Sequence, residues 1–369
     1  MSNVTLTVVG DIAFGGPFAA DPVGVAKRVA PSIRDLIRAD IVLANLEGPL
    51  CNIPAETANP LSLSSPIQAI ESIRWLGINA VALANNHIMD CGRAGLESTL
   101  TVLQENGVAH FGAGLDKKGA SQPAIIDWAG TRVAFLGFHG GKIATRNSPG
   151  TLIVDSSWAK KIIRRTRRQC DHLVVYFHGG IEAVNYPLRS IMQACRRCVD
   201  CGATLVVGTH THTIQGIETY HGVPIAYSLG NFILPMAMPD RYEQWRQATG
   251  LTRLGIPFDR KTILRALVLK CTLHKEGKAE AKGVPIVVDE SGLPRLPAME
   301  EAAEAETFFQ NLCESFHHPD APCWRQRDEI EKGFFRLQRS EFTLGYIARN
   351  LMRLRPRHLI AYIKTILRS

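Results

Sequence analysis

Short apolar runs alternate with amphipathic segments along most of the chain. Runs of about 4–8 apolar residues are typical of buried strands, and apolar residues at i, i+3 and i+4 between them predict amphipathic helices. This alternation favours an α/β fold. The predicted strands cover residues 4–9, 40–44, 78–84, 124–128, 131–138, 172–177, 203–207, 214–217, 223–227 and 263–273. The predicted helices cover residues 25–38, 67–76, 93–106, 156–168, 188–201 and 299–316.

Two neighbouring apolar runs form a hairpin and not a strand–helix–strand unit. Gly130 separates residues 124–128 from residues 131–138, and a glycine between two such runs is typical of a β-turn. An antiparallel element at this point argues against a simple doubly wound parallel sheet. We therefore expect sheets of mixed strand direction.

Residues that can bind metal ions gather where the apolar runs stop. A polar residue directly after one strand is explained by its preference for turns. Polar residues at the same position after several strands are not explained in this way. Such endings at neighbouring strands of an α/β sheet form a common site. The residues at these positions are Asp11, Asn45, Glu47, Asn86, His87, His178, His210 and His212.

The donor types restrict the chemistry. Oxygen and imidazole nitrogen without thiolate suit Mn, Fe, Zn or Mg, as one ion or as a pair. Two ions about 3.5–4 Å apart bind a phosphate group and activate a water molecule for attack. In Asn86-His87, the amide oxygen can bind metal while the imidazole donates a proton to the leaving group. The alternative, that His210 and His212 are ordinary loop histidines, stays open at this point.

Six motifs in order resemble the CapA family, the poly-γ-glutamate capsule synthesis proteins related to calcineurin-like metallophosphoesterases. The resemblance covers residues 4–275. It implies a four-layer α/β/β/α sandwich with two mixed sheets and a metal centre at the strand ends. The motifs are Gly10-Asp11, Asn45-Leu46-Glu47, Asn85-Asn86-His87 with Asp90 and Gly92, His178-Gly179-Gly180 with Glu182, Gly208-Thr209-His210-Thr211-His212, and Ser228-Leu229-Gly230-Asn231-Phe232.

The resemblance also implies roles for the residues at the motif positions. One metal ion would be bound by Asp11 with His212, and Glu47 would be the bridging carboxylate, with Asn45 assisting. His87 would be the general acid, so that His87 and Asp11 are the expected catalytic residues. The second ion would be bound by Asn86, His178 and His210. Residues expected to contact substrate or support the ligands are Asn45, Asp90, His139, Glu182 and Asn231.

The chain departs from the wider metallophosphoesterase pattern at two positions. That pattern begins Asp-x-His, whereas this chain has Asp11-Ile12-Ala13, so the first metal site is one ligand short. Gly179 stands where an aromatic residue is expected after His178. The first departure leaves open a weaker second metal, a single-metal site, or a site that binds phosphate-like groups without fast turnover.

Composition and charge indicate the compartment and the surfaces. The 369 residues are 46% hydrophobic and carry a net charge of +8. The start of the chain has no basic segment followed by an apolar stretch, and no run approaches the ~20 apolar residues that cross a bilayer. Nine cysteines, an odd number, suit a reducing compartment better than a disulfide framework. We therefore expect a cytoplasmic protein, and we expect Cys195, Cys198 and Cys201 to be structural.

The end of the chain differs from the rest in charge. From Trp324 the pattern is basic and mostly helical, with a break near Pro356. We predict a domain of residues 1–290 and a helical, basic C-terminal extension of residues 291–369. This extension either packs on the core or makes a peripheral contact with an anionic membrane surface. No pattern of alternating aromatic and basic residues predicts nucleic-acid binding.

Three functional hypotheses follow. The first is a metal-dependent hydrolase that acts on a small molecule or a γ-glutamyl polymer, with the polymer suggested by the resemblance alone. The second is a non-catalytic assembly factor that keeps the metal centre as a scaffold and binds a polymer or a partner protein. The third is an enzyme that cleaves amide bonds with the same centre.

Overall fold

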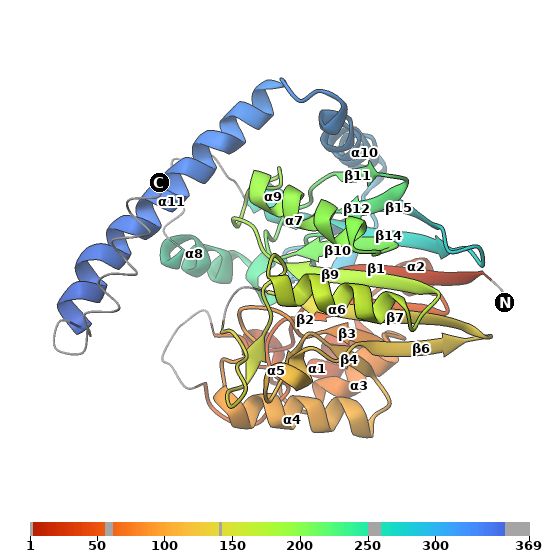
Figure 1. Cartoon of the computed structure of the whole chain (residues 1–369), viewed down its shortest axis with the longest axis horizontal. Helices are drawn as coiled ribbons and strands as arrows, with labels where there is room; N and C mark the ends of the chain where they lie inside the picture. The colour runs from red at the N-terminus through yellow and green to blue at the C-terminus, as the bar shows by residue number, and fades with distance from the viewer. Residues whose placement is uncertain (1–2, 56–61, 140–141, 250–259, 351–369) are drawn as a thin grey trace.

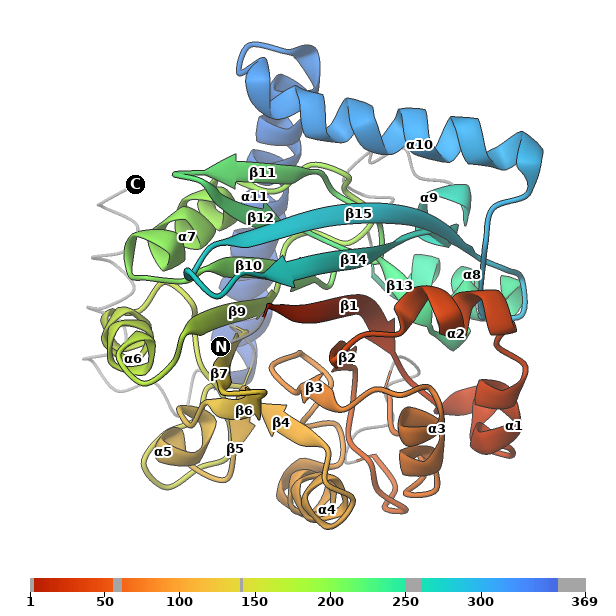
Figure 2. The same ribbon diagram turned by 90° about the vertical axis from the view of Figure 1, so that its right-hand side faces the viewer.

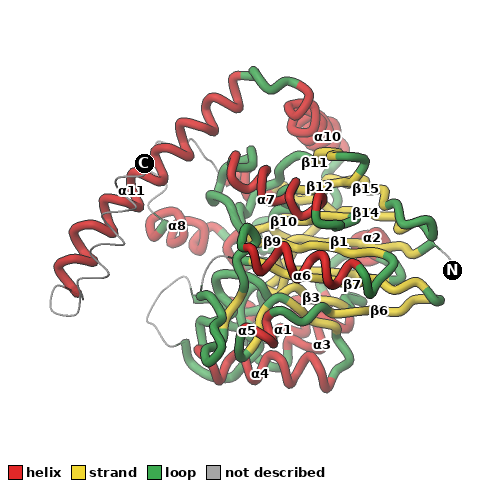
Figure 3. Tube along the Cα trace, in the orientation of Figure 1, coloured by secondary structure: helices red, strands yellow, loops and turns green. Residues whose placement is uncertain are grey.

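The computed structural model describes residues 3–55, 62–139, 142–249 and 260–350. Within these ranges two large β-sheets pack face to face, and helices cover both outer faces (Figures 1 and 2). Figure 3 shows the same arrangement, with the strands in the middle and the helices around them.

The first sheet has the strand order β16-β15-β14-β1-β2-β3-β4, with β13 paired to β1. The strand β1 runs parallel to β2 and β13 and antiparallel to β14, so this sheet is mixed. Its strands are β1 (Val4–Ile12), β2 (Ile41–Leu46), β3 (Ala80–Ala82), β4 (Ala109–Phe111), β13 (Asn231–Ile233), β14 (Arg265–Leu273), β15 (Ala279–Val288) and β16 (Pro294–Arg295).

The second sheet has the order β11-β12-β10-β9-β7-β6 and is also mixed. The strands β7, β9 and β10 are parallel, whereas β6 and β7 form the antiparallel hairpin that the sequence predicts. A small separate sheet pairs β5 (Ala113–Gly114) with β8 (Gly150–Thr151). The strands of the second sheet are β6 (Ala124–Trp128), β7 (Thr131–Phe138), β9 (His172–His178), β10 (Leu205–Thr209), β11 (Ile217–Tyr220) and β12 (Val223–Ala226).

Three apolar clusters hold the four layers together. One lies between the sheets and includes Leu6 of β1 and Tyr176 of β9. A second packs the first sheet against four helices, and a third packs α6 (Ser157–Arg167) and α7 (Arg189–Asp200) on the second sheet. These layers confirm the predicted α/β/β/α sandwich with two mixed sheets. The four helices on the first sheet are α1 (Pro22–Lys27), α2 (Pro31–Ile37), α3 (Ala69–Trp75) and α4 (Gly92–Glu105).

The burial of the strands explains their sequences. Every residue of β2, β9 and β10 is buried, because helices cover one face of each sheet and the other sheet covers the opposite face. Strands buried on both sides are continuously apolar and show no alternation. For this reason the polar residues that end these strands stand out in the sequence.

Several of the predicted element boundaries were wrong. The single helix predicted for residues 25–38 is two helices, α1 and α2, because Pro31 lacks a backbone N–H and begins a new helix. The strands β1 and β2 are longer than predicted and contain Asp11 and Asn45. These two side chains are therefore held by strand backbone and not by loops.

The C-terminal part begins on the sandwich and then leaves it. The helix α10 (Met299–Glu314) packs Phe309 and Leu312 against the cluster between the sheets. The following helix α11 (Pro322–Asn350) extends along one side of the molecule (Figure 1), and near its start Arg327 donates to the carbonyl of Pro187 at 2.6 Å. The remaining short helices are α5 (Lys117–Ala120), α8 (Pro239–Ala248) and α9 (Arg260–Leu264).

The helical extension is thus confirmed as far as residue 350. The division at residue 290 stays a prediction, although β16 and α10 lie beyond it and pack with the preceding part. Pro356 and the arginines after residue 350 lie outside the described residues. No helix among the described residues combines the length and the apolar character that crossing a membrane requires.

A glycine to alanine change at position 10 should test how closely β1 must approach β13. A Cβ atom on Gly10 would lie 1.9 Å from the carbonyl oxygen of Gly230, so the two backbones would have to separate. We expect Gly10→Ala to lower the free energy of unfolding by about 3 kcal/mol or more in urea titrations. The control is Gly119→Ala, whose Cβ would make only ordinary contacts, 3.4 Å or longer. Equal stability of the two variants would contradict this account.

Candidate metal centre

The predicted ligands come together at one end of the two sheets. In the first sheet, Asp11 of β1 lies in register with Asn45 of β2 on one side and Asn231 of β13 on the other. In the second sheet, β9 ends in His178, and His210 follows the end of β10. Because parallel strands end at the same edge, segments far apart in the sequence bring their polar groups together.

Two carboxylates and one imidazole form the buried part of the site. Ligand atoms of Asp11, Glu47 and His212 all lie within 4.8 Å of one another, and the two carboxylates are fully buried. The Oδ2 atom of Asp11 and both carboxylate oxygens of Glu47 have no hydrogen-bond partner among the described residues. Buried carboxylate oxygens without a donor are costly, and a bound cation would satisfy all three.

A second set of atoms that can bind a metal ion surrounds the Nε2 atom of His178. The amide oxygen of Asn86 lies 2.9 Å from it, the Nδ1 atom of His210 lies 3.1 Å from it, and Glu47 Oε1 lies 3.6 Å from it. Glu47 Oε1 is also 4.0 Å from His212 Nε2, so this carboxylate lies between the two sets. Its position fits the bridging role that the resemblance implies, and the role itself stays a prediction.

The backbone of the Thr209–Thr213 segment aims both of its histidines at the carboxylates. His210 and His212 have φ angles of 100° and 56°, in the left-handed region that few non-glycine residues adopt. Such conformations persist only where the surroundings hold them, and they are common at functional sites. This geometry favours a functional role for His210 and His212 over the interpretation as ordinary loop histidines, and their role as ligands stays a prediction.

Burial sets the charge of the metal-free cluster. It raises the pKa of Asp11 to about 7, and burial together with the nearby Asp11 charge raises the pKa of Glu47 well above its usual value. Burial also lowers the pKa of His212 to about 4 and the pKa values of His178 and His210 well below the usual value. The imidazoles are therefore neutral at pH 7, with lone pairs available to a metal ion.

Three amide side chains hold the ligands in place. Asn45 donates to Asp11 Oδ1 at 2.7 Å, and Asn231 Oδ1 lies 2.9 Å from His212 Nδ1. Asn85, which the sequence analysis placed in a motif without a role, donates to Asn45 Oδ1 at 3.2 Å. Hydrogen bonds of this kind orient metal ligands and fix histidine tautomers. In this geometry Asn45 and Asn231 contact two of the candidate ligands, and their supporting role stays a prediction.

His87 lies at the edge of the cluster with one ring nitrogen engaged. Its Nδ1 atom is 2.8 Å from Asp90 Oδ2, which also accepts from the backbone N–H of Leu63 at 2.6 Å. A carboxylate at Nδ1 places the proton on that nitrogen and leaves Nε2 for proton exchange. His87 is one of the residues that line a cavity of about 170 Å³, together with Asn86 and His212.

His139 and Glu182, both expected as supporting residues, lie on different sides of the cluster. The ring centroid of His139 is 5.5 Å from that of His178, its Nδ1 is 2.6 Å from the His178 carbonyl, and its buried Nε2 has no partner among the described residues. Glu182 lines the cavity, and its Oε2 accepts from Trp245 Nε1 at 2.8 Å. Burial raises the pKa of Glu182 to about 7.

Two contributions to the site were not predicted from the sequence. Thr209 Oγ1 lies 3.0 Å from His178 Nδ1, and its position inside the His210 motif was the available signal. The helix α8 contributes Arg241 and Trp245 to the cavity, and nothing in the local pattern of α8 points to the site. Cys195, Cys198 and Cys201 are buried in the cluster beneath α7, as expected of structural cysteines.

The residues present fit a divalent cation. The site combines two carboxylates with orphaned oxygens, neutral imidazoles and an amide oxygen, which are the donors that Mn, Fe, Zn and Mg accept. In the part of the chain that the structure describes, Asp11, Glu47 and His212 are also the one group of three or more acidic, His or Cys residues with ligand atoms this close together.

Comparison with known proteins supports the resemblance. CapA proteins of Bacillus anthracis, described as a capsule biosynthesis protein, and of Bacillus subtilis, described as a PGA biosynthesis protein, are each 30% identical to the chain, over 251 and 209 residues. These alignments cover 63% and 54% of this chain, and they span 60% and 55% of the two relatives. A probable polyglutamine synthesis accessory protein of Mycobacterium tuberculosis is 26% identical over 211 residues.

Two solved structures are more distant. A structure described as a novel phosphatase from Mycoplasma pneumoniae is 13% identical, with a TM-score of 0.49 over 78% of this chain and 94% of the other. A Thermus thermophilus protein is 9% identical, with a TM-score of 0.38 over 76% of this chain and 98% of the other. At these TM-scores neither structure decides the fold or the function.

The match to a family model decides the family. The model described as "Bacterial capsule synthesis protein PGA_cap" matches residues 5–236, which is more than half of the chain and includes all the predicted ligands. The CapA resemblance is therefore confirmed, and the chain belongs to the PGA_cap family of bacterial capsule synthesis proteins.

Proposed function

We propose that the protein is a metal-dependent hydrolase in the synthesis or processing of poly-γ-glutamate or a related capsular polymer. The observation that carries the hydrolytic part is the pair of buried carboxylates, Asp11 and Glu47, whose unpartnered oxygens face neutral imidazoles. Such a pair is stable as carboxylate only with a cation between them. The polymer is suggested by the names of the relatives, which the chain matches over 60% of their length or less.

The residues divide the chemistry between them. A bound divalent ion would polarise the scissile group and activate water, a role such ions have in many hydrolases. Asp11, Glu47, His212, Asn86, His178 and His210 would hold one or two such ions. His87 would donate a proton to the leaving group from Nε2, and Asp90 at its Nδ1 would orient the ring and stabilise the imidazolium.

The scaffold function remains the second candidate, and one residue favours it. Ala13 stands where the wider pattern has a histidine, and it is fully buried among apolar residues such as Ile181 and Leu234. This position supplies no ligand, so the Asp11–His212 side has fewer donors than a full two-metal site. A protein that binds one ion tightly and turns nothing over would fit this arrangement.

Metal removal is the first test. We expect the purified protein to contain a divalent ion, and chelation to lower its Tm, because an ion at 100 times its Kd stabilises the folded state by about 2.7 kcal/mol. Glu47→Gln should weaken metal affinity by about 100-fold or more, since it removes the carboxylate between the two donor sets. Glu97→Gln, at an exposed position in α4, is the control and should behave as wild type. A metal-free protein with an unchanged Tm would contradict the proposal.

The pH dependence of metal binding is the second test. With its pKa raised to about 7, Asp11 holds a proton in the metal-free protein at pH 6, and the raised pKa of Glu47 favours its protonated form, so the ion must displace protons. The imidazoles are already neutral, so they release no protons when a metal ion binds. Metal affinity should therefore fall as the pH falls below about 7, by about tenfold per pH unit for each proton displaced. Calorimetry in two buffers of different ionisation enthalpy measures the protons released, and a value of zero at pH 6 would refute this charge assignment.

Removal of the general acid separates the two candidate functions. With phosphate monoesters, phosphate diesters and γ-glutamyl amides as substrates, His87→Ala should lower kcat by about 10²–10⁴-fold and leave metal content unchanged. His110→Ala on β4, away from the site, is the matched control. Metal bound without turnover of any ester or amide would favour the scaffold. Turnover of the γ-glutamyl amides alone would identify an amide-cleaving enzyme.

A further inference from the structure

The cavity beside the metal centre has one wall that the ligand motifs do not explain. The helix α8 supplies Arg241, Gln244 and Trp245 to this wall. Residues at i, i+3 and i+4 lie on one face of a helix, so these three side chains face the cavity together. The same cavity is also lined by Asn86, His87 and His212 of the metal centre.

Trp245 fixes the helix over the site. Its ring lies edge-on to that of His212 with the centroids 6.1 Å apart, and its Nε1 donates to Glu182 at 2.8 Å. Trp245 and Tyr242 are buried in the same apolar cluster as Ala13 and Leu234. Packing therefore fixes the position of α8 relative to the candidate metal ligands, and with it the position of the Arg241 backbone.

Arg241 differs from the other arginines near a cavity. Its Nη1 donates to the side-chain oxygen of Gln244 at 3.0 Å, and no carboxylate pairs with it among the described residues. Its Nη2 lies 3.5 Å from the position that a Cβ on Gly16 would occupy, so the guanidinium lies close to the loop that follows Asp11. A guanidinium has five N–H donors, and an amide oxygen satisfies one of them.

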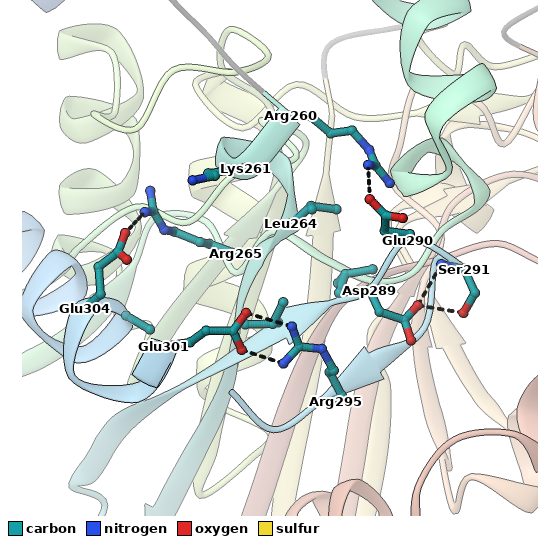
Figure 4. Close-up of a pocket in the computed structure, with 13 residues that line it drawn as sticks. Arg260, Lys261, Leu264, Arg265, Asp289, Glu290, Ser291, Arg295, Glu301 and Glu304 are labelled. Carbon is teal, nitrogen blue, oxygen red and sulfur yellow. Dashed lines mark hydrogen bonds and ion pairs between the residues drawn. The ribbon is translucent and has the colours of Figure 1, made fainter. Parts of the chain in front are cut away.

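A larger cavity of about 770 Å³ provides the contrast (Figure 4). There Arg260 pairs with Glu290 at 2.7 Å, Arg265 pairs with Glu304 at 2.7 Å, and Arg295 forms two bonds to Glu301 at 2.6 and 2.8 Å. Each guanidinium in that cavity already has a carboxylate partner. An anion entering it would have to compete with these carboxylates, whereas an anion reaching Arg241 would not.

We infer that Arg241 binds a second anionic group of the ligand whose first group is held at the metal centre, and that it sets the preference of the site for doubly anionic ligands. The inference rests on the proposed metal-dependent function. A cavity of about 170 Å³ is smaller than the ~300–1,000 Å³ of sites that enclose a whole drug-sized ligand, so it receives one end of a longer molecule. Among the described residues that line this cavity, Arg241 is the one lysine or arginine, so it is the position for the second anionic group.

The second group is a carboxylate or a phosphate, since a guanidinium binds either one through paired N–H donors. The two sources can be separated with matched ligands. The carboxylate pair is γ-glutamyl-glutamate and the same dipeptide with both α-carboxyl groups amidated. The phosphate pair is propane-1,3-diyl bisphosphate and propyl phosphate.

The test is calorimetric binding of all four ligands to the metal-loaded full chain, so that it does not depend on turnover. In the wild type, one pair should show tighter binding of the member with more anionic groups, by about 10- to 100-fold. Arg241→Ala should abolish this difference, and Arg241→Lys should restore part of it. Arg93→Ala, an exposed arginine of α4, is the matched control and should keep the full difference.

Two results would overturn the inference. One is the absence of any difference within both pairs in the wild type. The other is a difference that persists in Arg241→Ala to within twofold. Thermal unfolding of each variant with and without metal shows whether the fold and the metal centre are intact. With the residues that the structure describes, Arg241 makes a single side-chain hydrogen bond, so its removal should leave both in place. Binding without turnover would refute the hydrolase and leave the role of Arg241 standing.

Discussion

The burial of Asp11 and Glu47 side by side is the constraint on which the rest of the site depends. Removing one carboxylate from water costs several kcal/mol, and a second negative charge nearby adds to the cost. Three oxygens of this pair receive no hydrogen bond from the described residues, so the protein itself offers only the amide of Asn45 and the segment around Thr209 as compensation. Without a cation, burial favours the protonated form of both carboxyl groups, and with a cation the two carboxylates would become ligands.

The sandwich architecture makes this site a junction between the two sheets. Asp11 and Glu47 belong to the first sheet and its loops, whereas His178 ends β9 and His210 follows β10 of the second sheet. A bound ion would therefore join two layers that also pack through a shared apolar cluster. The mixed direction of the first sheet matters here, because only the parallel neighbours of β1 bring Asn45 and Asn231 alongside Asp11.

The sequence predicted the layers and pointed to the polar residues that the structure brings together, but it did not predict the contacts between them. Continuous apolar runs and the polar residues that end them are local signals, so Asp11, Asn86, His178, His210 and His212 could be recognised before the structure. The break at Pro31 was also local and was overlooked, because helical spacing on both sides of it suggested one helix.

What the sequence could not reveal depends on contacts between distant segments. The hydrogen bond from Asn45 to Asp11 requires the register of β1 with β2, and apolar periodicity carries no information on register. The same holds for α8, whose residues show no motif. Its place beside His212 follows from the packing of Trp245 with residues more than 30 positions away, such as Ala183 and His212 itself.

The missing histidine at position 13 and the presence of α8 are parts of one arrangement. Ala13 packs in the same apolar cluster as Trp245, and Trp245 contacts His212. Apolar side chains therefore fill the space on the His212 side of the centre, where the wider pattern has a histidine ligand. Asp11 and Glu47 are also inaccessible, and the exposed ligand is Asn86, next to His87. A substrate would therefore approach from the side of Asn86 and His87. Arg241 lines that same cavity. His87, which would donate the proton, and Arg241, which would select the ligand, would therefore contact the same bound molecule.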